Sequence, residues 1–341
     1  MSHWSRITGE GPVVVIAEAG VNHDGLPDDA HALVELAARS GADVVKFQTF
    51  RVDSAVSPEA PTAAYQVANT GQRRQFEMLS ELVLPDSIWP ELAEHARSRG
   101  LGFVSTPFDL ESAEMLAAIG IEFVKVPSGE LTNLPFLGRL SLIFKHMLVS
   151  TGMASMDEVG VAVEALEDQV DLALLHCISA YPAPMDQLNL RAISTLRQRF
   201  SLPVGWSDHS LSGDSAVMAV ALGASVVEKH ITLDRGRPGP DHKASSDEIE
   251  MTQFVRGIRN AEKMLGSGAK EVQPCELDAR EVSRRSWHVR DRLDRGHTLR
   301  EIDIVALRPG SGISPSESIV GRRLAVSVDR GTLLTPEMLD D

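Results

Sequence analysis

The sequence predicts an α/β fold, in which a (β/α)₈ TIM barrel is followed by a small C-terminal β module. Short β-branched segments alternate with segments of helical spacing along most of the 341 residues. Eight such strand-and-helix units over roughly 250 residues match the usual count and size of this barrel. After Leu265 the alternation ends and the sequence becomes rich in turns, which indicates a separate, smaller module.

The expected barrel strands share short runs of β-branched residues. They cover Val13–Ala17, Asp43–Phe47, Gly102–Ser105, Glu122–Val126, His146–Ser150, Asp171–His176, Leu202–Gly205 and Ser225–Glu228. Segments rich in Ala, Leu, Glu and Arg lie in most of the gaps, at Asp28–Ser40, Glu91–Gly100, Glu111–Gly120 and Asp157–Leu166. Their spacing is typical of helices. Several of these helices stop at a glycine, Gly41, Gly100 or Gly120, where left-handed backbone is free of strain.

A doubly wound open sheet is the alternative fold for a chain that alternates in this way. That fold usually carries a glycine-rich phosphate loop directly after an early strand. Here the first expected strand leads instead into Glu18-Ala19-Gly20-Val21-Asn22-His23. The barrel is therefore the favoured prediction.

The expected boundaries place a barrel domain at residues 1–265, a linker at 266–282 and a β module at 283–341. The linker opens with the flexible composition Gly266-Ser267-Gly268-Ala269-Lys270. The module contains a weak internal repeat, in which Leu293–Leu299 resembles Val328–Leu334. Each copy joins a strand-like run to an Asp-Arg-Gly turn, which predicts a small pseudo-symmetric β fold.

The amino-acid composition limits which partners the protein can bind and which cellular compartment is expected for it. A formal net charge of −15 disfavours nucleic acids and anionic membranes, because like charges repel. A small anionic substrate is still possible, since a few lysines can dominate the local field. No apolar run reaches the roughly 18 residues of a membrane span, and Val13–Ala17 is too short for a signal-peptide core. With Cys177 and Cys275 far apart, a cytoplasmic protein is expected.

In a barrel of this kind the active site lies at the C-terminal ends of the strands. Those positions hold Glu18, Lys46 with Gln48, Thr106, Lys125 with Ser128, Ser150 with Thr151, Ser179 with Tyr181, Asp208 with His209, and Glu228 with His230. Each of these groups can bind an anion, a metal or a sugar. A random surface would not distribute them so evenly around one rim.

Lys46 and Lys125 each close an apolar strand, and two lysines that converge on a barrel mouth make a site for a small, multiply charged anion. The hydroxyls of Thr106, Ser128 and Ser150 can donate to the same anion. One alternative is that each lysine only pairs with a neighbouring carboxylate. Another is a Schiff-base role, which strand-end lysines have in aldolases.

His209 and His230 follow the last two strands, which are neighbours in a closed barrel. Both imidazoles could bind one divalent metal, with water or substrate completing its coordination. A purely structural role for both histidines is the alternative. Asp241-His242 forms an acid–base pair in the last loop, and the prolines after Tyr181 fix a loop that could hold the tyrosine over the site.

A set of ordered motifs resembles those of the sialic acid synthase family. They are Ile16–Gly25, Val45–Thr49, Ser105–Asp109, Lys125–Glu130, Ser150–Met153, Trp206–His209, Glu228–His230 and Arg237–Asp241. The tail, including Leu307–Gly310, resembles the antifreeze-like (SAF) module that follows the barrel in these synthases. The resemblance covers nearly the whole chain.

The resemblance implies a transferase that condenses phosphoenolpyruvate with an N-acylated amino sugar to give a sialic-type acid and phosphate. It implies a divalent cation, Mn²⁺ or Mg²⁺, and a homodimer in which each SAF module caps the partner's barrel. The metal ligands would be His209 and His230. The groups that hold phosphoenolpyruvate would be Lys46, Thr106, Lys125, Ser128 and Ser150.

The resemblance also assigns the remaining site residues. Glu18, Gln48, Tyr181 and Asp241 would face the sugar and the reacting centre. Ser179, which stands where one family member has asparagine, would be a further substrate contact, and Asn69 lies in a loop that touches the sugar in relatives. Arg308 would reach the N-acyl group from the partner subunit.

Three alternatives and one open choice remain at this point. The alternatives are other phosphoenolpyruvate-condensing enzymes, which the SAF module and Arg308 disfavour, a Schiff-base aldolase, and a carbohydrate- or ice-binding protein. The open choice is the acceptor, N-acetylmannosamine or 2,4-diacetamido-2,4,6-trideoxymannose, with phosphorylated sugars also possible. The segment from Ala64 to Leu79, with Asn69-Thr70-Gly71, resembles bacterial sialate and legionaminate enzymes more than pseudaminate ones.

Overall fold

The computed structural model describes residues 2–9 and 11–340 of the chain. It divides the chain into two compact units, Met1–Gly266 and Ser267–Asp341. In the described part of the chain, none of the helices is both long and apolar enough to cross a membrane.

The first unit is a parallel eight-stranded sheet that curls into a barrel. Its strands are β1 (Val14–Gly20), β2 (Val44–Thr49), β3 (Gly102–Pro107), β4 (Val124–Val126), β5 (His146–Ser150), β6 (Asp171–Cys177), β7 (Val204–Asp208) and β8 (Val226–His230). Hydrogen bonds join them in the order β3-β2-β1-β8-β7-β6-β5-β4. The two end strands, β3 and β4, are also packed together, so the predicted (β/α)₈ barrel is confirmed.

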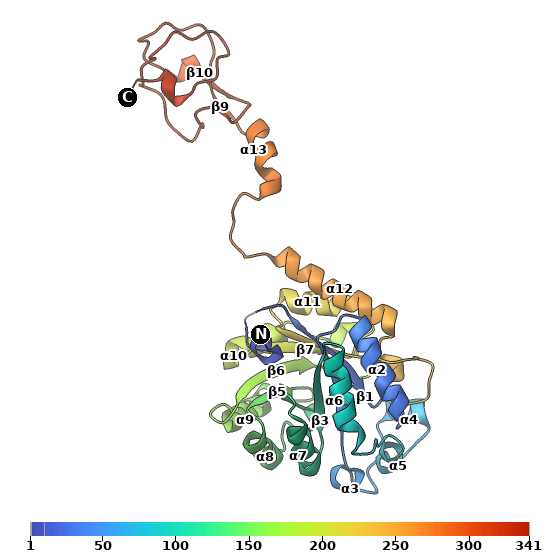
Figure 1. Ribbon diagram of the computed structural model, residues 1–341. Coiled ribbons are helices and arrows are strands. Elements are labelled where there is room, and N and C mark those ends of the chain that lie inside the picture. The colour runs from blue at the N-terminus through green and yellow to red at the C-terminus, as the bar shows by residue number, and fades with distance from the viewer. Residues whose placement is uncertain (1, 10, 341) are drawn as a thin grey trace. The chain divides into compact units, whose positions relative to one another are not determined.

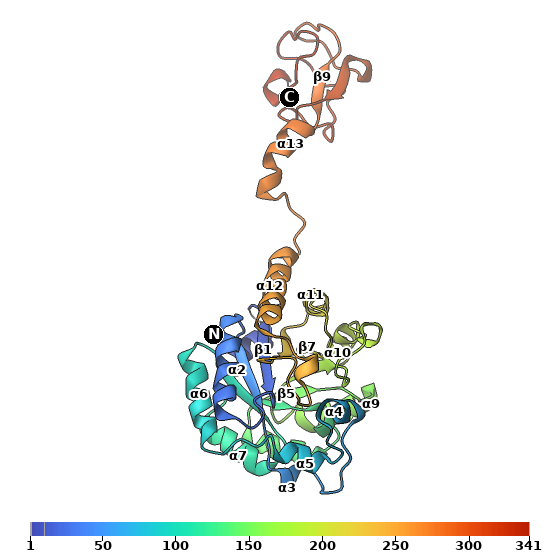
Figure 2. The same ribbon diagram turned by 90° about the vertical axis from the view of Figure 1, so that its right-hand side faces the viewer.

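Helices surround the strands of this unit (Figure 1 and Figure 2). They are α2 (Pro27–Arg39), α6 (Ile88–Ser98), α7 (Leu110–Ile119), α8 (Leu134–Ile143), α9 (Met156–Leu166), α10 (Ala192–Phe200), α11 (Asp214–Ala221) and α12 (Glu248–Leu265). The predicted glycine stops at the ends of α2, α6 and α7 have the expected left-handed backbone, with φ of +78° at Gly41, Gly100 and Gly120. The long connection from β2 to β3 also holds α3 (Val52–Ala55), α4 (Ala64–Thr70) and α5 (Gln75–Ser80).

Side chains alternate between the two faces of each strand, and they therefore form two separate hydrophobic cores. Outward-facing residues such as Val45, Val149 and Val227 pack under the helices in one large cluster. Inward-facing residues fill one end of the barrel: Val14, Ile16, Val44, Val104, Phe123, Leu148, Ala173, Leu175 and Val226. Because side chains on a strand alternate between its two faces, the next inward positions lie two residues further on, towards the C-terminal ends of the strands.

The short helix α1 (His3–Ile7) adds Trp4 and Ile7 to the inner apolar cluster. The Glu122 carboxylate anchors it by accepting from the backbone N–H groups of His3 at 3.2 Å and Trp4 at 2.9 Å. This end of the barrel is therefore apolar inside, which leaves the opposite end for polar chemistry.

The second unit is a small β module with its own core. It contains α13 (Leu277–Ser283), β9 (Ser286–Val289) and β10 (Ile304–Leu307), the two strands being antiparallel. Its core consists of Val289, Leu299, Ile304, Ile313, Ile319, Leu324, Val328, Leu334 and Leu339. Part of the segment expected as a linker is thus helical and belongs to this unit.

The internal repeat of the second unit is visible in its backbone. Leu293 and Val328, which begin the two copies, exchange both N–H···O bonds at 2.9 Å. The glycines of the two Asp-Arg-Gly turns, Gly296 and Gly331, have φ of +81° and +79°. The copies therefore pair with each other in a pseudo-symmetric arrangement.

Candidate active site

A layer of polar side chains lies directly above the inner apolar layer of the barrel. This layer contains Glu18, Lys46 and Thr106, each of which lies two positions after an inward apolar residue, Ile16, Val44 or Val104. The other strands contribute Lys125, Ser150, Cys177, Ser207 and the pair Glu228 and His230 at corresponding positions. Because side chains alternate with a period of two along each strand, all eight strands place a polar side chain at the same end of the barrel.

A cavity of about 410 Å³ opens at this end. The predicted site residues that line it are Glu18, Lys46, Gln48, Lys125, Ser128, Ser150, Ser179, Tyr181, His209 and His230. Thr106 lies beneath it, where its Oγ1 accepts from Lys46 Nζ at 3.1 Å. Asp241 lies beside it, with Oδ2 3.8 Å from His230 Nδ1.

A buried network of two lysines and two glutamates forms the floor of the cavity. Lys46 Nζ lies 2.7 Å from Glu18 Oε2 and 3.6 Å from Glu228 Oε2. Lys125 Nζ lies 3.7 Å from Glu228 Oε1, which also accepts from Ser207 Oγ at 2.8 Å. The charges in this network balance, so an entering anion would change the charge state of the floor.

The environment shifts the pKa values of these groups in different directions. Burial lowers the pKa of Lys125, while the two carboxylates outweigh burial and raise the pKa of Lys46. Burial and the nearby Glu228 raise the pKa of Glu18 despite its pairing with Lys46. Burial alone would raise the pKa of Glu228, but the two lysines lower it to about 2. Glu228 is therefore the permanent anion of the floor, and Glu18 is the carboxyl better suited to hold a proton.

His209 and His230 lie side by side above this floor, with ring centroids 5.5 Å apart. His209 Nδ1 lies 2.7 Å from the carbonyl oxygen of Ile178, so Nδ1 carries the hydrogen and Nε2 keeps a lone pair. His230 Nδ1 is buried and has no hydrogen-bond partner among the described residues. Burial lowers the pKa of His209 to about 4 and that of His230 well below its usual value. Both rings are therefore neutral near pH 7, the form that binds a metal.

This donor set fits a divalent cation that takes only part of its coordination from protein. In the part of the chain that the structure describes, no three His, Cys, Asp or Glu side chains converge on one point as a complete metal-binding group. The available lone pairs are those of His209 Nε2 and the orphaned His230 Nδ1. Oxygen ligands from substrate and water would have to complete the shell.

An aromatic stack forms one wall of the cavity. The Tyr181 ring lies 4.2 Å from His209 and 5.3 Å from Tyr65, measured between ring centroids. Tyr65 comes from α4, and Asn69 of the same helix donates to the carbonyl oxygen of Pro240 at 3.1 Å. The β2–β3 connection and the loop after β8 therefore meet at the mouth of the site.

Two residues that the sequence predicts for the site do not line the cavity. Asp208 ends β7 but faces outward, where it pairs with Lys229 at 3.3 Å and accepts from Ser215 Oγ at 2.7 Å. Asp208 is therefore wrong as a rim group, and Ser207 takes the inward position by strand alternation. Arg308 is exposed at the end of β10 in the second unit, and its predicted contact with the acceptor stays a prediction.

Several cavity residues were not predicted as site residues. Ser207 and Cys177 could have been selected by counting in twos from the apolar residues of β6 and β7. The β2–β3 connection supplies Ala63, Tyr65, Gln66 and Gln75, and Phe108 and Met153 follow β3 and β5. No periodic signal marks these loop positions, because only tertiary packing brings them over the barrel.

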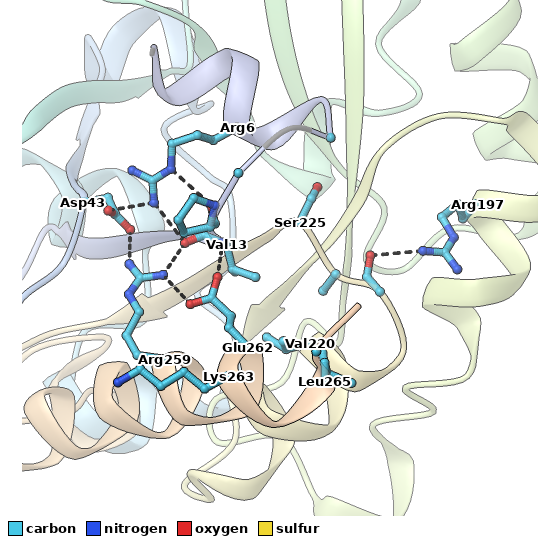
Figure 3. A pocket seen from close by; sticks show the side chains of 16 residues that line it. Arg6, Val13, Asp43, Arg197, Val220, Ser225, Arg259, Glu262, Lys263 and Leu265 are labelled. Carbon is cyan, nitrogen blue, oxygen red and sulfur yellow. Dashed lines mark hydrogen bonds and ion pairs between the residues drawn. The ribbon is translucent and has the colours of Figure 1, made fainter. Parts of the chain in front are cut away.

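A larger cavity, of about 990 Å³, lies at the opposite end, before the first residues of β1, β2 and β8 (Figure 3). Four of its charged groups form one network: Asp43 binds both Arg6, at 2.9 Å, and Arg259. Arg259 also pairs with Glu262 at 3.1 Å. These ion pairs connect α1, α12 and the start of β2, so this cavity has a structural explanation and the chemistry stays with the smaller one.

Residues 33–270 match the NeuB family, and residues 284–340 match the SAF domain. The chain belongs to the NeuB family. The predicted resemblance to sialic acid synthases with a C-terminal SAF domain is confirmed. This NeuB-family chain is 44% identical to the N,N'-diacetyllegionaminic acid synthase of Legionella pneumophila, over 96% of this chain and 94% of that protein.

Two further comparisons agree with this assignment. The N,N'-diacetyllegionaminic acid synthase of Campylobacter jejuni is 40% identical, over 88% of this chain and 92% of that protein. The crystal structure of the N-acetylneuraminic acid synthetase from Leptospira borgpetersenii, in complex with citrate, is similar with a TM-score of 0.69. It is 30% identical and covers 79% of this chain and 90% of that one.

Proposed function

We propose that this NeuB-family protein condenses phosphoenolpyruvate with an N-acylated amino sugar, releasing phosphate and forming a nonulosonic acid. The observation that carries the proposal is the Glu18–Lys46–Glu228–Lys125 network beside two neutral histidines in one cavity. The buried lysines suit a small anion, and the neutral imidazoles suit a metal. The names of the most similar relatives support the same reaction class.

Phosphoenolpyruvate would occupy the closed end of the cavity. Lys46 and Lys125 would neutralise its carboxylate and phosphate, and Thr106, Ser128, Ser150 and Ser179 would donate hydrogen bonds. Ser128 Oγ already accepts from the Gly152 backbone N–H at 3.0 Å, which orients its own hydrogen towards other acceptors. Fixing the anion in this way holds its methylene carbon in line for attack.

A divalent cation, Mn²⁺ or Mg²⁺, held by His209 and His230 would polarise the aldehyde oxygen of the open-chain sugar. The methylene carbon of phosphoenolpyruvate then bonds to the aldehyde carbon, and water adds to the former enol carbon. Glu18, with its raised pKa, holds and returns the proton during these steps. Phosphate leaves by cleavage of its bond to that carbon, which gives a 2-keto-3-deoxy acid.

The proposed acceptor is 2,4-diacetamido-2,4,6-trideoxymannose, without a phosphate group. Among the described cavity-lining residues the lysines are Lys46 and Lys125, both buried against carboxylates. Other lining residues are uncharged: Tyr65, Gln66, Gln75, Phe108 and Met153. Such a surface suits acetamido groups and a methyl group, whereas a phosphorylated sugar would need a free cation.

The proposal includes a homodimer in which the SAF module of one chain caps the cavity of its partner. Arg308, exposed on that module, would then bind the N-acyl carbonyl of the acceptor, while Gln48, Tyr181 and Asp241 contact the sugar from the barrel side. A cytoplasmic location is also proposed, because Cys177 and Cys275 are both free thiols, which suits a reducing compartment.

The test is phosphate release from phosphoenolpyruvate and Mn²⁺ across a panel of acceptors. The panel contains 2,4-diacetamido-2,4,6-trideoxymannose, N-acetylmannosamine and its 6-phosphate. We expect the highest kcat/KM with the first sugar. Absence of phosphate release with all three would refute the proposed reaction, and a preference for the 6-phosphate would refute the proposed acceptor.

The Schiff-base alternative has a separate test. Lys125 is the better candidate for such chemistry, because burial lowers its pKa and favours the neutral amine. Treatment with pyruvate and borohydride should leave the protein mass unchanged under the proposed reaction. A stable adduct on Lys125 would support an aldolase instead.

A further inference from the structure

The loop that carries Asp241 is fastened at both of its ends. It connects β8 to α12, and Thr232 N–H donates to Ser246 O at 2.9 Å while Ser246 N–H donates to His230 O at 2.8 Å. Asp241 lies in the middle of this loop and is buried, with Oδ2 3.8 Å from His230 Nδ1. Something other than the loop ends must therefore determine where the Asp241 carboxyl lies.

The next residue, His242, is fully buried and uses both of its ring nitrogens. Nε2 lies 3.0 Å from Asp24 Oδ1, and Nδ1 lies 2.7 Å from Thr232 Oγ1. A carboxylate oxygen accepts hydrogen bonds, so the Nε2–H of His242 donates to Asp24, while Nδ1 pairs with the Thr232 hydroxyl. These two bonds fix the orientation of the ring.

The residues that hold this loop come from the loop after β1. Asp24 has a positive φ of +53°, and its Oδ1 is the atom that binds His242 Nε2. Asn22 is fully buried, and its Nδ2 donates at 2.8 Å to both Ile231 O and Ser245 Oγ. Ser245 Oγ in turn donates to the carbonyl oxygen of Asp241 itself at 2.7 Å. Two hydrogen-bonded chains therefore run from the β1 loop to the backbone around Asp241.

Gly239 shows how closely the loop is packed onto the histidine. A Cβ atom at this position would lie 2.5 Å from His242 Cδ2 and 3.4 Å from Asp24 Oδ1. Only glycine allows the backbone to pass so close to the ring. A side chain at position 239 would therefore displace the His242 ring.

We propose that Asp24 and His242 are positioning residues that hold Asp241 against the acceptor side of the site. The inference rests on the proposed function, in which Asp241 contacts the sugar. It gives the Asn22-His23-Asp24 segment a role that involves no contact with substrate. Because a displacement of about 1 Å of a reacting group can cost roughly 100-fold in rate, loss of the Asp24–His242 bond should impair acceptor turnover.

The test compares three variants in steady-state phosphate release with the best acceptor of the panel. Asp24→Ala removes the contact, and we expect kcat/KM for the acceptor to fall about 10–100-fold. Asp24→Asn keeps an oxygen that accepts from His242 Nε2, so it should restore most of the activity. Asp29→Ala is the matched control, because Asp29 pairs with Arg237 of the same loop at 2.6 Å but has no bond to His242.

A second measurement separates positioning from folding. Stabilisation of each variant by phosphoenolpyruvate alone, measured as a shift in Tm, should match that of the wild type, because the anion end of the cavity is untouched. If Asp24→Ala does not fold, Thr232→Val removes the other bond to His242 at nearly constant volume. It should then lower acceptor kcat/KM in the same way.

The outcomes distinguish this inference from the proposed function. The positioning role alone would be overturned if Asp24→Ala kept the wild-type kcat/KM for the acceptor. It would also be overturned if Asp24→Ala and Asp24→Asn lost the same fraction of that kcat/KM. A wild-type protein that releases no phosphate with any acceptor would overturn the proposed function, and the positioning role with it.

Discussion

Lys46 Nζ lies 2.7 Å from Glu18 Oε2, and both side chains are buried in the floor of the cavity. Thr106 and Glu228 complete the surroundings of the ammonium group, at 3.1 Å and 3.6 Å. The lysine is thus held by three different strands. This pairing makes the floor neutral before substrate binds, and it makes the site sensitive to the loss of any one charge.

Replacing Lys46 should therefore cost stability as well as activity. In Lys46→Met, Glu18 and Glu228 lose their cation in a buried site, which typically costs about 3–5 kcal/mol. Urea unfolding would measure this loss, with Arg39→Met as the control, since the Arg39–Glu248 pair is exposed and worth about 1 kcal/mol or less. Adding Glu18→Gln to Lys46→Met should recover part of the loss, because it removes one orphaned carboxylate. Equal effects of the buried and exposed variants would contradict the assignment.

Removing one histidine of the proposed metal pair should abolish metal-dependent turnover. Loss of an outer contact to a metal ligand already costs about 10–100-fold, so His209→Ala should lower Mn²⁺-dependent phosphate release by at least that factor. Electron paramagnetic resonance would measure Mn²⁺ binding. Removal of the metal with a chelator should abolish phosphate release by the wild type. His31→Ala, on the outer helix α2 beside His95, is the control and should behave as wild type. Full activity of His209→Ala in metal-free buffer would rule out the metal role.

Gly205 in β7 should not tolerate a side chain. A Cβ atom there would collide with Val226 and lie 2.7 Å from Leu175 Cδ2 in the apolar end of the barrel. Overpacking of this kind costs about 1–3 kcal/mol, so Gly205→Ala should lower the free energy of unfolding by that amount. Gly138→Ala is the matched comparison. It lies in α8 with open space around it, and alanine there should add about 0.5–1 kcal/mol.

Glu122 should make the stability of the barrel depend on acid pH. Burial alone would raise its pKa, but hydrogen bonds from His3 and from the Trp4 backbone lower it from 4.5 to about 2. Because the pKa is lowered in the folded protein, the stabilisation is complete above pH 4.5 and is lost as the pH falls towards 2. At neutral pH, Glu122→Gln should destabilise the protein by about 1 kcal/mol, an amount discounted for partial exposure.

Thermal unfolding at a series of pH values would check this expectation. The difference in Tm between wild type and Glu122→Gln should shrink as the pH falls below the ordinary carboxyl range. Glu164→Gln, at an exposed position of α9, should show no such pH dependence. A constant difference for Glu122→Gln would mean that its charge does not anchor α1.

The barrel and most of its polar rim were predictable from local sequence. Strand alternation places Glu18, Lys46 and Lys125 inward once Ile16, Val44 and Phe123 are recognised as interior residues. The same rule, applied to β7, would have replaced Asp208 by Ser207. That error arose because the end of a strand was used as the criterion, instead of the face of the sheet.

The loop residues of the site could not be predicted in this way. Tyr65 reaches Tyr181 across more than a hundred residues of sequence, and Asp24 reaches His242 across 218. These contacts depend on how separate loops pack over the barrel, and no local periodicity encodes such packing. Motif resemblance could mark Asp241 as important, but it could not show what holds Asp241 in place.

By itself, the sequence determined the barrel, the polar ends of its strands and the family, because all three follow from short-range periodicity and ordered motifs. The tertiary structure alone decided which carboxylates meet which lysines and which tautomer His209 adopts. It also decided how the loops after β1 and β8 are bonded around Asp241. The physical reason is range: alternation acts between neighbours in the chain, whereas hydrogen bonds and ion pairs depend on distances that only the folded barrel sets.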